Sequence, residues 1–468
     1  MAVSFEYIPS TTLFQSTADP LIIQVREDTN NLEPKYRFIL QVRVPTLDGA
    51  ITGPIVATLK TYPTGPNSDS AVFDVSQICD DYIGPAYENS NTPGDPITAL
   101  GTAFSDPTKI ISLAQDGELT QARKFTLLLG YEYASSPTTD PVEYLAEEFT
   151  DFYAFRDNFT NYGEDYARGD GDYQPTTTSH ELMSTMALLD NTSNEGAAFG
   201  RVRMHYIGSR EALVIGWGQR VSTANYIHLT LFEQDGTVLD TEDININTQG
   251  GDTTPGLSQP ANVQYFGAGT INLFSWATEN GNTSLLAALN SASLYAYEIH
   301  LNTSLGGSNT NRVSGVHQFR IDDGCSKYPR RRLMWLNRVG AWEFFNFDQK
   351  SVNTLTNINR TSYNRPRGNW EAISSSVDWT YRGYERGTTT TQVMAEKQEV
   401  VSSGFMDEAY ADTLRDLAVS SNVFLVESAT RIVPVVVTNS EYLFKNSVND
   451  KLVNYQFTLR YANRPRLQ

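Results

Sequence analysis

The sequence contains little of what holds small secreted domains together or spans a membrane. Only two cysteines occur among 468 residues, Cys79 and Cys325, too few and too far apart for a disulfide framework or a zinc site. No stretch approaches the roughly 18 apolar residues of a membrane span. The segment after Met1 has neither the basic nor the apolar part of a signal peptide. We therefore expect a protein that stays in the cytosol or is packed there into a particle, without contact to membranes.

Motifs of catalysis are also scarce. The sequence has no G-x-S-x-G elbow, no Walker A loop and no G-x-G-x-x-G. Its five histidines are never three or four residues apart. The acidic stretch Glu164–Asp172 resembles part of a Ca²⁺ loop but lacks the closing Glu, so a solvated loop is the preferred interpretation. We predict no catalytic, cofactor-binding or metal-binding residues and no enzyme activity. A glycosidase that uses loop carboxylates stays open, because the spacing of its two carboxyl groups is spatial.

Charge is sparse and segregated. Only 19% of the residues are charged, and 35 basic residues face 54 acidic ones, a net charge of −19. The stretch 132–172 has eleven acidic and two basic residues, whereas Arg312–Arg386 has thirteen basic and seven acidic ones. Two interpretations remain open. The stretches are either solvated faces, or complementary patches on neighbouring subunits that steer assembly.

What the sequence does contain favours strands. Its 25 Tyr and 22 Phe suit pleated, half-buried surfaces. In the first region, 1–134, alternating apolar residues predict strands at 21–26, 36–44 and 125–133. Asp74 and Gln77 have the spacing of a capping box, which predicts a short helix with Asp74 as its N-cap. We expect this region to form an N-terminal β-sandwich with a short helix.

Two further regions are predicted. Ser135–Pro141 has the composition of a linker, and a central β-sandwich or jelly-roll domain follows at 145–381. Its strands are expected at 201–207, 212–217, 226–232, 238–241, 263–266, 295–301 and 313–321, with a turn at Asp235-Gly236. A C-terminal α+β domain, 388–468, has an amphipathic helix near 405–421 and strands at 423–426, 431–437 and 453–461. The fold class is mainly β, a multidomain arrangement of β-sandwich or jelly-roll modules with a few short helices.

One segment combines arginines with large aromatic residues. Four of the six tryptophans, Trp335, Trp342, Trp370 and Trp379, lie within 45 residues. Such residues mark either a domain core or a buried interface between subunits, and both remain open. The candidate interface residues are Arg330, Arg331, Arg332, Trp335, Arg338, Trp342 and Phe344. As exposed charges, the three consecutive arginines would contribute less than about 1 kcal/mol to the stability of one subunit.

The same segment carries a family resemblance. From Trp335 to Phe347 the pattern Trp-Leu-Asn-Arg-x-Gly-x-Trp-x-x-Phe-x-Phe resembles an element of virion structural proteins of tailed phages, namely tail, ring or collar components of crAss-like and related phages of Bacteroidota. Phe73–Cys79 is similar to the short Asp-capped helix of such proteins, and Leu414–Tyr461 is similar to their closing domain. The specific matches cover about 100 residues, a length within the range of one domain.

The resemblance implies a structural function. We expect a ring, collar or tail-hub subunit that is made in the cytoplasm of the host bacterium and built into the virion. Its partners would be other copies of itself in a cyclic ring and neighbouring tail, collar or portal-side proteins, with DNA passing through a lumen as a further candidate. The alternatives are a receptor- or glycan-binding tail protein, whose exposed aromatics would stack on sugars, and a glycan-degrading tail enzyme.

Overall fold

The computed structural model is mainly β and is built from several sheets. It describes residues 3–9, 14–17, 20–27, 34–44, 54–64, 69–83, 111–113, 122–155, 188–190, 201–219, 225–246, 262–306, 311–322, 327–337, 341–364, 368–373, 375–380, 387–407, 411–428, 431–438, 452–462 and 466–467. Cys325, the stretch Glu164–Asp172 and Arg338 lie outside these residues. No helix within the described ranges is long and apolar enough to cross a bilayer.

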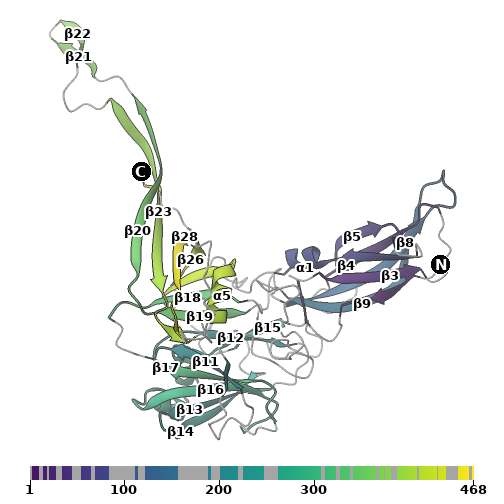
Figure 1. Cartoon of the computed structure of the whole chain (residues 1–468), viewed down its shortest axis with the longest axis horizontal. Helices are drawn as coiled ribbons and strands as arrows, with labels where there is room; N and C mark the ends of the chain where they lie inside the picture. The colour runs from purple at the N-terminus through teal and green to yellow at the C-terminus, as the bar shows by residue number, and fades with distance from the viewer. Residues whose placement is uncertain are drawn as a thin grey trace.

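The N-terminal module consists of two mainly antiparallel sheets that share one core (Figure 1). The three-stranded sheet has the order β1-β3-β6, from Val3–Tyr7, Ile22–Glu27 and Ser70–Asp74. The five-stranded sheet has the order β2-β9-β8-β4-β5, from Phe14–Ser16, Val142–Phe155, Ala122–Tyr133, Arg37–Arg43 and Ile55–Thr61. Alternate residues of each strand are buried, as in Ile23 and Val25 of β3 and Phe38 and Leu40 of β4, so the sequence pattern predicted these strands correctly.

The short helix α1, Ser76–Asp81, begins one residue later than predicted. Val75 occupies the N-cap position and makes no side-chain cap bond. The Asp74 carboxylate instead accepts the N–H groups of Ser76 at 3.0 Å and Leu21 at 3.2 Å. Asp74 therefore ties the helix to the strand β3, and Cys79 of the helix is buried in the core.

The predicted boundary at 134–145 falls inside a hairpin. Strands β8 and β9 pair antiparallel from Ala122 to Phe155, and Ser135–Pro141 lies in their connection. Strand β7, Ile111–Leu113, belongs by sequence to the first region but pairs with β15 of the central module. The chain thus passes between modules before the N-terminal sheet is complete.

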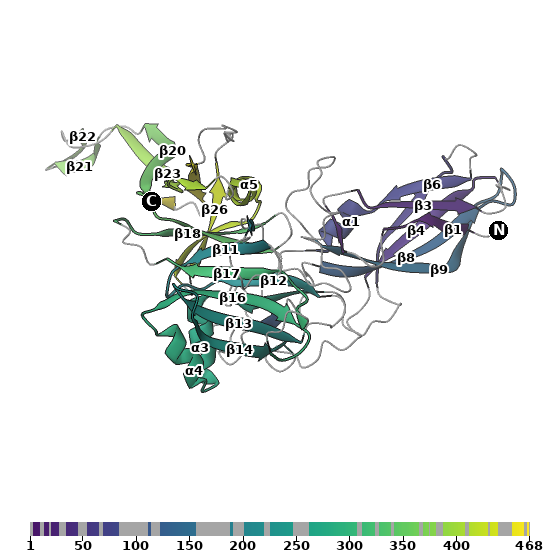
Figure 2. The ribbon, with the colours of Figure 1, turned by 60° about the horizontal axis from the view of Figure 1, so that its bottom comes forward.

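The central module has a six-stranded sheet with a helical cover (Figure 2). Its order is β10-β11-β17-β16-β13-β14, from Leu188–Asp190, Arg201–Ile207, Val316–Ile321, Leu294–Asn302, Tyr226–Glu233 and Val238–Asn245. A second sheet has the order β12-β15-β7, with β12 at Val214–Gln219 and β15 at Asn262–Gly267. The hairpin β13–β14 turns at Asp235-Gly236 as predicted, with Gly236 at φ +87°.

Two helices of the central module were not predicted. They are α3, Thr270–Glu279, and α4, Thr283–Leu289. Leu273 and Trp276 of α3 and Leu285 of α4 are buried in the same core as the sheet residues Leu229 and Ile299. The helices therefore close one side of the central core.

The C-terminal module is built on an eight-stranded sheet. Along the order β19-β18-β25-β26-β28-β23-β20, with β29 beside β23, the strands are Trp342–Phe347, Arg331–Leu336, Val423–Ser428, Arg431–Val437, Gln456–Tyr461, Thr388–Ser402, Val352–Asn364 and Arg466–Leu467. The helix α5 is Ala411–Val419 and is shorter than the predicted 405–421, because Met406–Asp407 form strand β24 with β27, Leu452–Val453. Leu414 and Leu417 of α5 are buried against this sheet.

A long β-ribbon projects from this sheet. Strands β20 and β23 pair along twelve residue pairs, and the small hairpin β21–β22, Asn369–Ile373 and Ser376–Thr380, lies at the far end. Both views place this arm on one side of the body and the N-terminal module on the other (Figures 1 and 2). The predicted boundary at 381–388 therefore lies within the arm, between two strands of one sheet.

Candidate functional site

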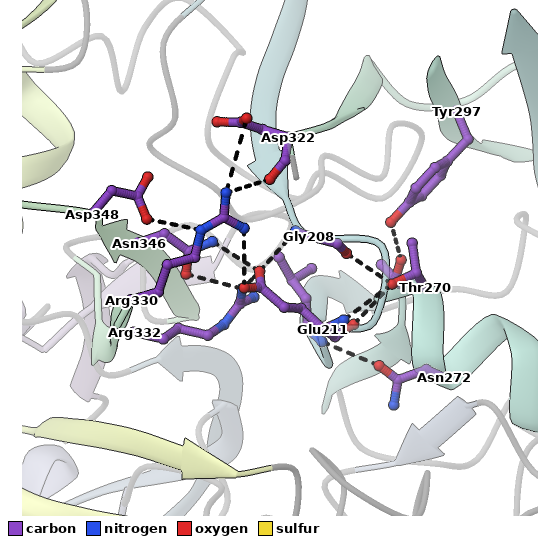
Figure 3. Close-up of polar contacts among 12 residues, drawn as sticks. Gly208, Glu211, Thr270, Asn272, Tyr297, Asp322, Arg330, Arg332, Asn346 and Asp348 are labelled. Carbon is purple, nitrogen blue, oxygen red and sulfur yellow. Dashed lines mark hydrogen bonds and ion pairs between the residues drawn. The ribbon is translucent and has the colours of Figure 1, made fainter. Parts of the chain in front are cut away.

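The predicted basic run lies where the C-terminal sheet meets the central module. Glu211 occupies the turn between β11 and β12, whereas Arg332 and Asn346 belong to β18 and β19. The Arg332 guanidinium donates to Glu211 Oε2, and the Asn346 amide donates to the same oxygen at 2.8 Å (Figure 3). Arg332 also lies over the ring of Phe344, 5.2 Å from its centroid. These contacts join the two modules.

Arg330 extends the same cluster. Its Nε lies 2.8 Å from Asp348 Oδ1, and its Nη2 donates to the carbonyl oxygen of Asp322 at 2.5 Å. Its Nη1 is 3.7 Å from Glu211 Oε1. Two arginines thus share one glutamate and one aspartate, and the positive charge of the run is balanced within the chain. We call Glu211, Arg330, Arg332, Asn346 and Asp348 the Glu211 cluster.

The start of α3 fixes the position of Glu211. The Thr270 hydroxyl donates to the carbonyl oxygen of Gly208 at 3.0 Å and accepts the N–H of Glu211 at 3.2 Å. Asn272 accepts the N–H of Leu213 at 3.1 Å. A Cβ at Gly269 would lie 2.4 Å from the nitrogen of Leu213, so only glycine allows the helix to approach this turn so closely.

The cluster keeps Glu211 ionised. Burial by itself would raise the pKa of Glu211, but Arg332, the N–H of Gly208 and the Asn346 amide outweigh it and lower that pKa below the usual 4.5. A carboxylate with three donors and an arginine partner is stable as the anion. The cluster is therefore an ion pair in the folded chain.

Arg331 points to the opposite face of the sheet. Its Nε lies 2.6 Å from Glu399 Oε1, and the Tyr461 hydroxyl donates to the other oxygen of Glu399 at 2.8 Å. Glu399 is fully buried. The expectation that Arg330, Arg331 and Arg332 are solvent-exposed charges is thus wrong, because each is at least half-buried and pairs with a carboxylate of the same chain.

The predicted aromatic anchors are core residues. Trp335 is fully buried with Leu333 in the core under α5, whereas Trp342 and Phe344 are buried in the central core. The sequence left core and interface open, and the structure places all three side chains in the interior of the subunit. Because neighbouring residues of β18 and β19 enter different cores, this element joins the central and C-terminal modules.

Two buried or half-buried acids of the stretch 132–172, Glu132 and Asp151, are paired within the chain. Glu132 lies 2.8 Å from Arg37 and 2.7 Å from Lys60, and Asp151 lies 2.6 Å from Lys124. The pairs of Arg37 with Glu132 and of Lys124 with Asp151 cross neighbouring strands, where such charges stabilise strand pairing, whereas Lys60 reaches Glu132 from β5 across β4.

The histidines of the central sheet pack in pairs. His205 Nε2 lies 2.9 Å from His317 Nδ1, and His228 hydrogen-bonds Asp243 at 2.7 Å. His300 lies opposite His228 across the strands, and burial lowers the pKa of His300 to about 3. No group of three or more potential metal ligands occurs among the residues that the structure describes.

The arm presents the most exposed tryptophans of the described chain. Trp370 and Trp379 face each other across β21 and β22, with ring centroids 5.5 Å apart and planes at 82°. They remain 63% and 46% exposed. A Cβ at Gly368, which has φ +100°, would lie 2.6 Å from Trp379 Nε1, so glycine is needed beside this pair. The sequence signalled the clustering of these tryptophans, but the projecting ribbon that carries them was not predicted.

These side chains can hold two modules together and offer a surface to a partner. The Glu211 cluster fixes two modules to each other, and the arm offers apolar surface far from the body. No protein-family model and no curated protein matches the chain.

Proposed function

We propose that this chain is a non-enzymatic structural subunit of a cyclic virion assembly, a ring, collar or tail-hub component of a tailed phage. The observation that carries the proposal is the projecting arm formed by β20–β23. The resemblance of the motif from Trp335 to Phe347 to phage virion proteins supports the proposal. In the structure, strands of this motif join two modules of the subunit.

The arm has the properties of a docking element. A two-stranded ribbon buries little surface of its own and is marginally stable in water when it stands alone. Here the ribbon is anchored, since β23 pairs with β28 at its base. Beyond that base it exposes Leu355, Tyr363 and Trp370 to solvent. A contact with another molecule would bury this surface, and apolar burial is the main driving force of association.

The central and C-terminal modules are joined by apolar packing and by charge. Met334 and Trp342 enter the central core, and Leu333 and Trp335 enter the C-terminal core, from the same two strands. The Glu211 cluster adds charged contacts beside them. Two modules whose cores meet on β18 and β19 and that share an ion pair are joined more firmly than modules with a small polar interface.

Cyclic assembly, location in the virion and contact with neighbouring tail, collar or portal-side proteins are parts of the same proposal. A ring forms when a heterologous contact repeats around an axis and closes. DNA would then pass through the lumen of the ring.

Electron microscopy of the purified full chain tests the proposal. We expect class averages of closed rings with one rotational symmetry, at micromolar concentration and at low salt. Isolated particles of subunit size under all conditions, and also in the presence of neighbouring virion proteins, would overturn it. A monomer that retains glycans through Trp370 and Trp379 would instead support the receptor-binding alternative.

A further inference from the structure

The arm and the N-terminal module lie on opposite sides of the body (Figures 1 and 2), and both expose apolar side chains. In the described part of the arm they are Val352, Leu355, Tyr363, Trp370, Val377 and Trp379. In the described part of the N-terminal module they are Tyr7, Ile55, Tyr62, Val72, Val142, Tyr144 and Leu145. Two separate apolar surfaces on opposite sides are what a head-to-tail contact between identical copies requires.

The tip of the arm has one apolar face. Trp370 pairs with Trp379 across the hairpin, and Val377 lies two residues from Trp379 on the same face. Val377 is 62% exposed. Glu371 and Asp378 pair across the opposite face. The hairpin is thus amphipathic, although its two strands enclose no core of their own.

The side of the arm is an open strand edge. β20 is the last strand of its sheet in the described order. Its thirteen residues, Val352–Asn364, include one charge, Arg360, and neither lysine nor proline. Edge strands that do not pair with another chain usually carry charged residues, above all lysine, or proline. The composition of β20 therefore favours contact along the arm as well as at its tip.

Charge points to a second copy as the partner. Residues 352–391 contain five arginines and three acidic residues, while the rest of the chain contains 30 basic and 51 acidic residues. The bodies of two copies repel each other, and the arm is attracted to the body of another copy. The partner surface should thus be both apolar and acidic.

The hairpin end of β8–β9 meets both requirements. Tyr144 stacks on Tyr131 and Tyr133, with centroids 5.3 and 5.1 Å away, and is 40% exposed. Val142 beside it is 55% exposed. Asp140 and Glu143 of the same hairpin are exposed acidic residues.

We propose that the arm of one copy, residues 352–391, docks on the aromatic hairpin end of β8–β9 around Val142 and Tyr144 in the next copy. The contact joins two different surfaces, so every copy offers one arm and one acceptor and the chain of contacts closes into a ring. This inference rests on the proposed function, since it names the contact that builds the assembly.

Two complementary variants test the contact. The first removes residues 361–392 and joins Arg360 to Val393 through Asn-Gly, because these two residues pair in the ribbon and Asn-Gly closes a two-residue hairpin. The second is Val142→Arg with Tyr144→Arg, which places positive charge on the acceptor. The matched control is Val238→Arg, a residue of β14 that is 51% exposed.

Analytical ultracentrifugation of the full chain and these variants decides the outcome. We expect rings for the parent and for Val238→Arg, and monomers for each variant alone. An equimolar mixture should give one-to-one heterodimers and nothing larger, since it contains one intact arm and one intact acceptor per pair. Heterodimers also show that both variants are folded.

The outcomes separate the two claims. Rings formed without the arm would overturn the docking inference and leave the proposed function standing. Monomeric variants whose mixture stays monomeric would overturn the pairing of arm and acceptor. A parent that never assembles would refute the proposed function and the docking inference together.

Discussion

Loss of the Arg332 side chain should strongly destabilise the subunit. Its side chain is 8% exposed, that of its partner Glu211 is 20% exposed, and removing one member of a buried pair costs about 3–5 kcal/mol. Because Glu211 retains some contact with water, we expect about 2–4 kcal/mol for Arg332→Met. At roughly 2–4 °C per kcal/mol for a unit of 150–250 residues, the melting temperature should fall by about 4–16 °C.

A double-mutant cycle isolates the ion pair from the lost packing. Glu211→Gln keeps an acceptor for the N–H of Gly208, while Arg332→Met keeps most of the side-chain volume. Urea unfolding of both single variants and the double variant should give a coupling energy of about 1–3 kcal/mol, the range of residues in direct contact. Arg210→Met, which removes an exposed arginine beside Glu211, should change stability by less than about 0.5 kcal/mol.

The same pair determines a pH dependence. The folded-state pKa of Glu211 lies below its usual 4.5, so its contribution is complete above pH 4.5 and is lost as the pH falls through the lower folded-state pKa. Glu211→Gln should weaken this loss. A coupling energy near zero, together with single variants as stable as Arg210→Met, would refute the account of the Glu211 cluster.

Three further predictions follow from burial and geometry. Trp342→Ala should lower the free energy of unfolding by about 3–5 kcal/mol in chemical denaturation, because the side chain is almost fully buried in the central core; a loss below 1 kcal/mol would contradict its core position. Burial, with His228 and Arg312 nearby and Asp243 opposing, holds the pKa of His300 near 3, below the usual 6.5. The free energy of unfolding should therefore fall as the pH drops from 6.5 towards 3, and it should fall less steeply in His300→Gln. Equal slopes in the two proteins would show that His300 does not titrate differently on unfolding. Gly368→Ala should disturb the Trp370–Trp379 pair, because Gly368 has φ +100° and an added Cβ would meet Trp379 and Thr380 of the tip. We expect a change in near-ultraviolet circular dichroism without a shift of the main unfolding transition, and an unchanged spectrum would contradict the tip geometry.

The strands were predictable because their sequence pattern and their environment agree. Phe38, Leu40 and Val42 alternate in the sequence and are all buried on one face of β4. The same holds for Tyr455, Phe457 and Leu459 near the C-terminus. For strands with one face in a core, period-two alternation carries most of the information.

The sequence of the unpredicted helices α3 and α4 does contain a helical pattern and a cap residue. Leu273, Trp276 and Ala277 have helical spacing and are buried together. Asn282 caps α4 by accepting the N–H of Leu285 at 3.0 Å, as an Asn at a helix start often does. The Gly- and Asn-rich segment around these residues obscured the pattern.

The Glu211 cluster was not predictable from the sequence. Glu211 and Arg332 are 121 positions apart, and nothing local distinguishes this glutamate from an exposed one. The predicted domain boundary at 134–145 was misplaced for a related reason. Ser135–Pro141 has linker composition, yet it joins two paired strands, because turn residues serve hairpins and linkers alike.

Whether the chain forms a ring can be read from native mass spectrometry of the full chain. We expect one dominant species whose mass is a whole-number multiple of 52.1 kDa, and which dissociates as salt screens the charges between subunits. A single 52.1 kDa species at every concentration and ionic strength would contradict a ring-forming subunit.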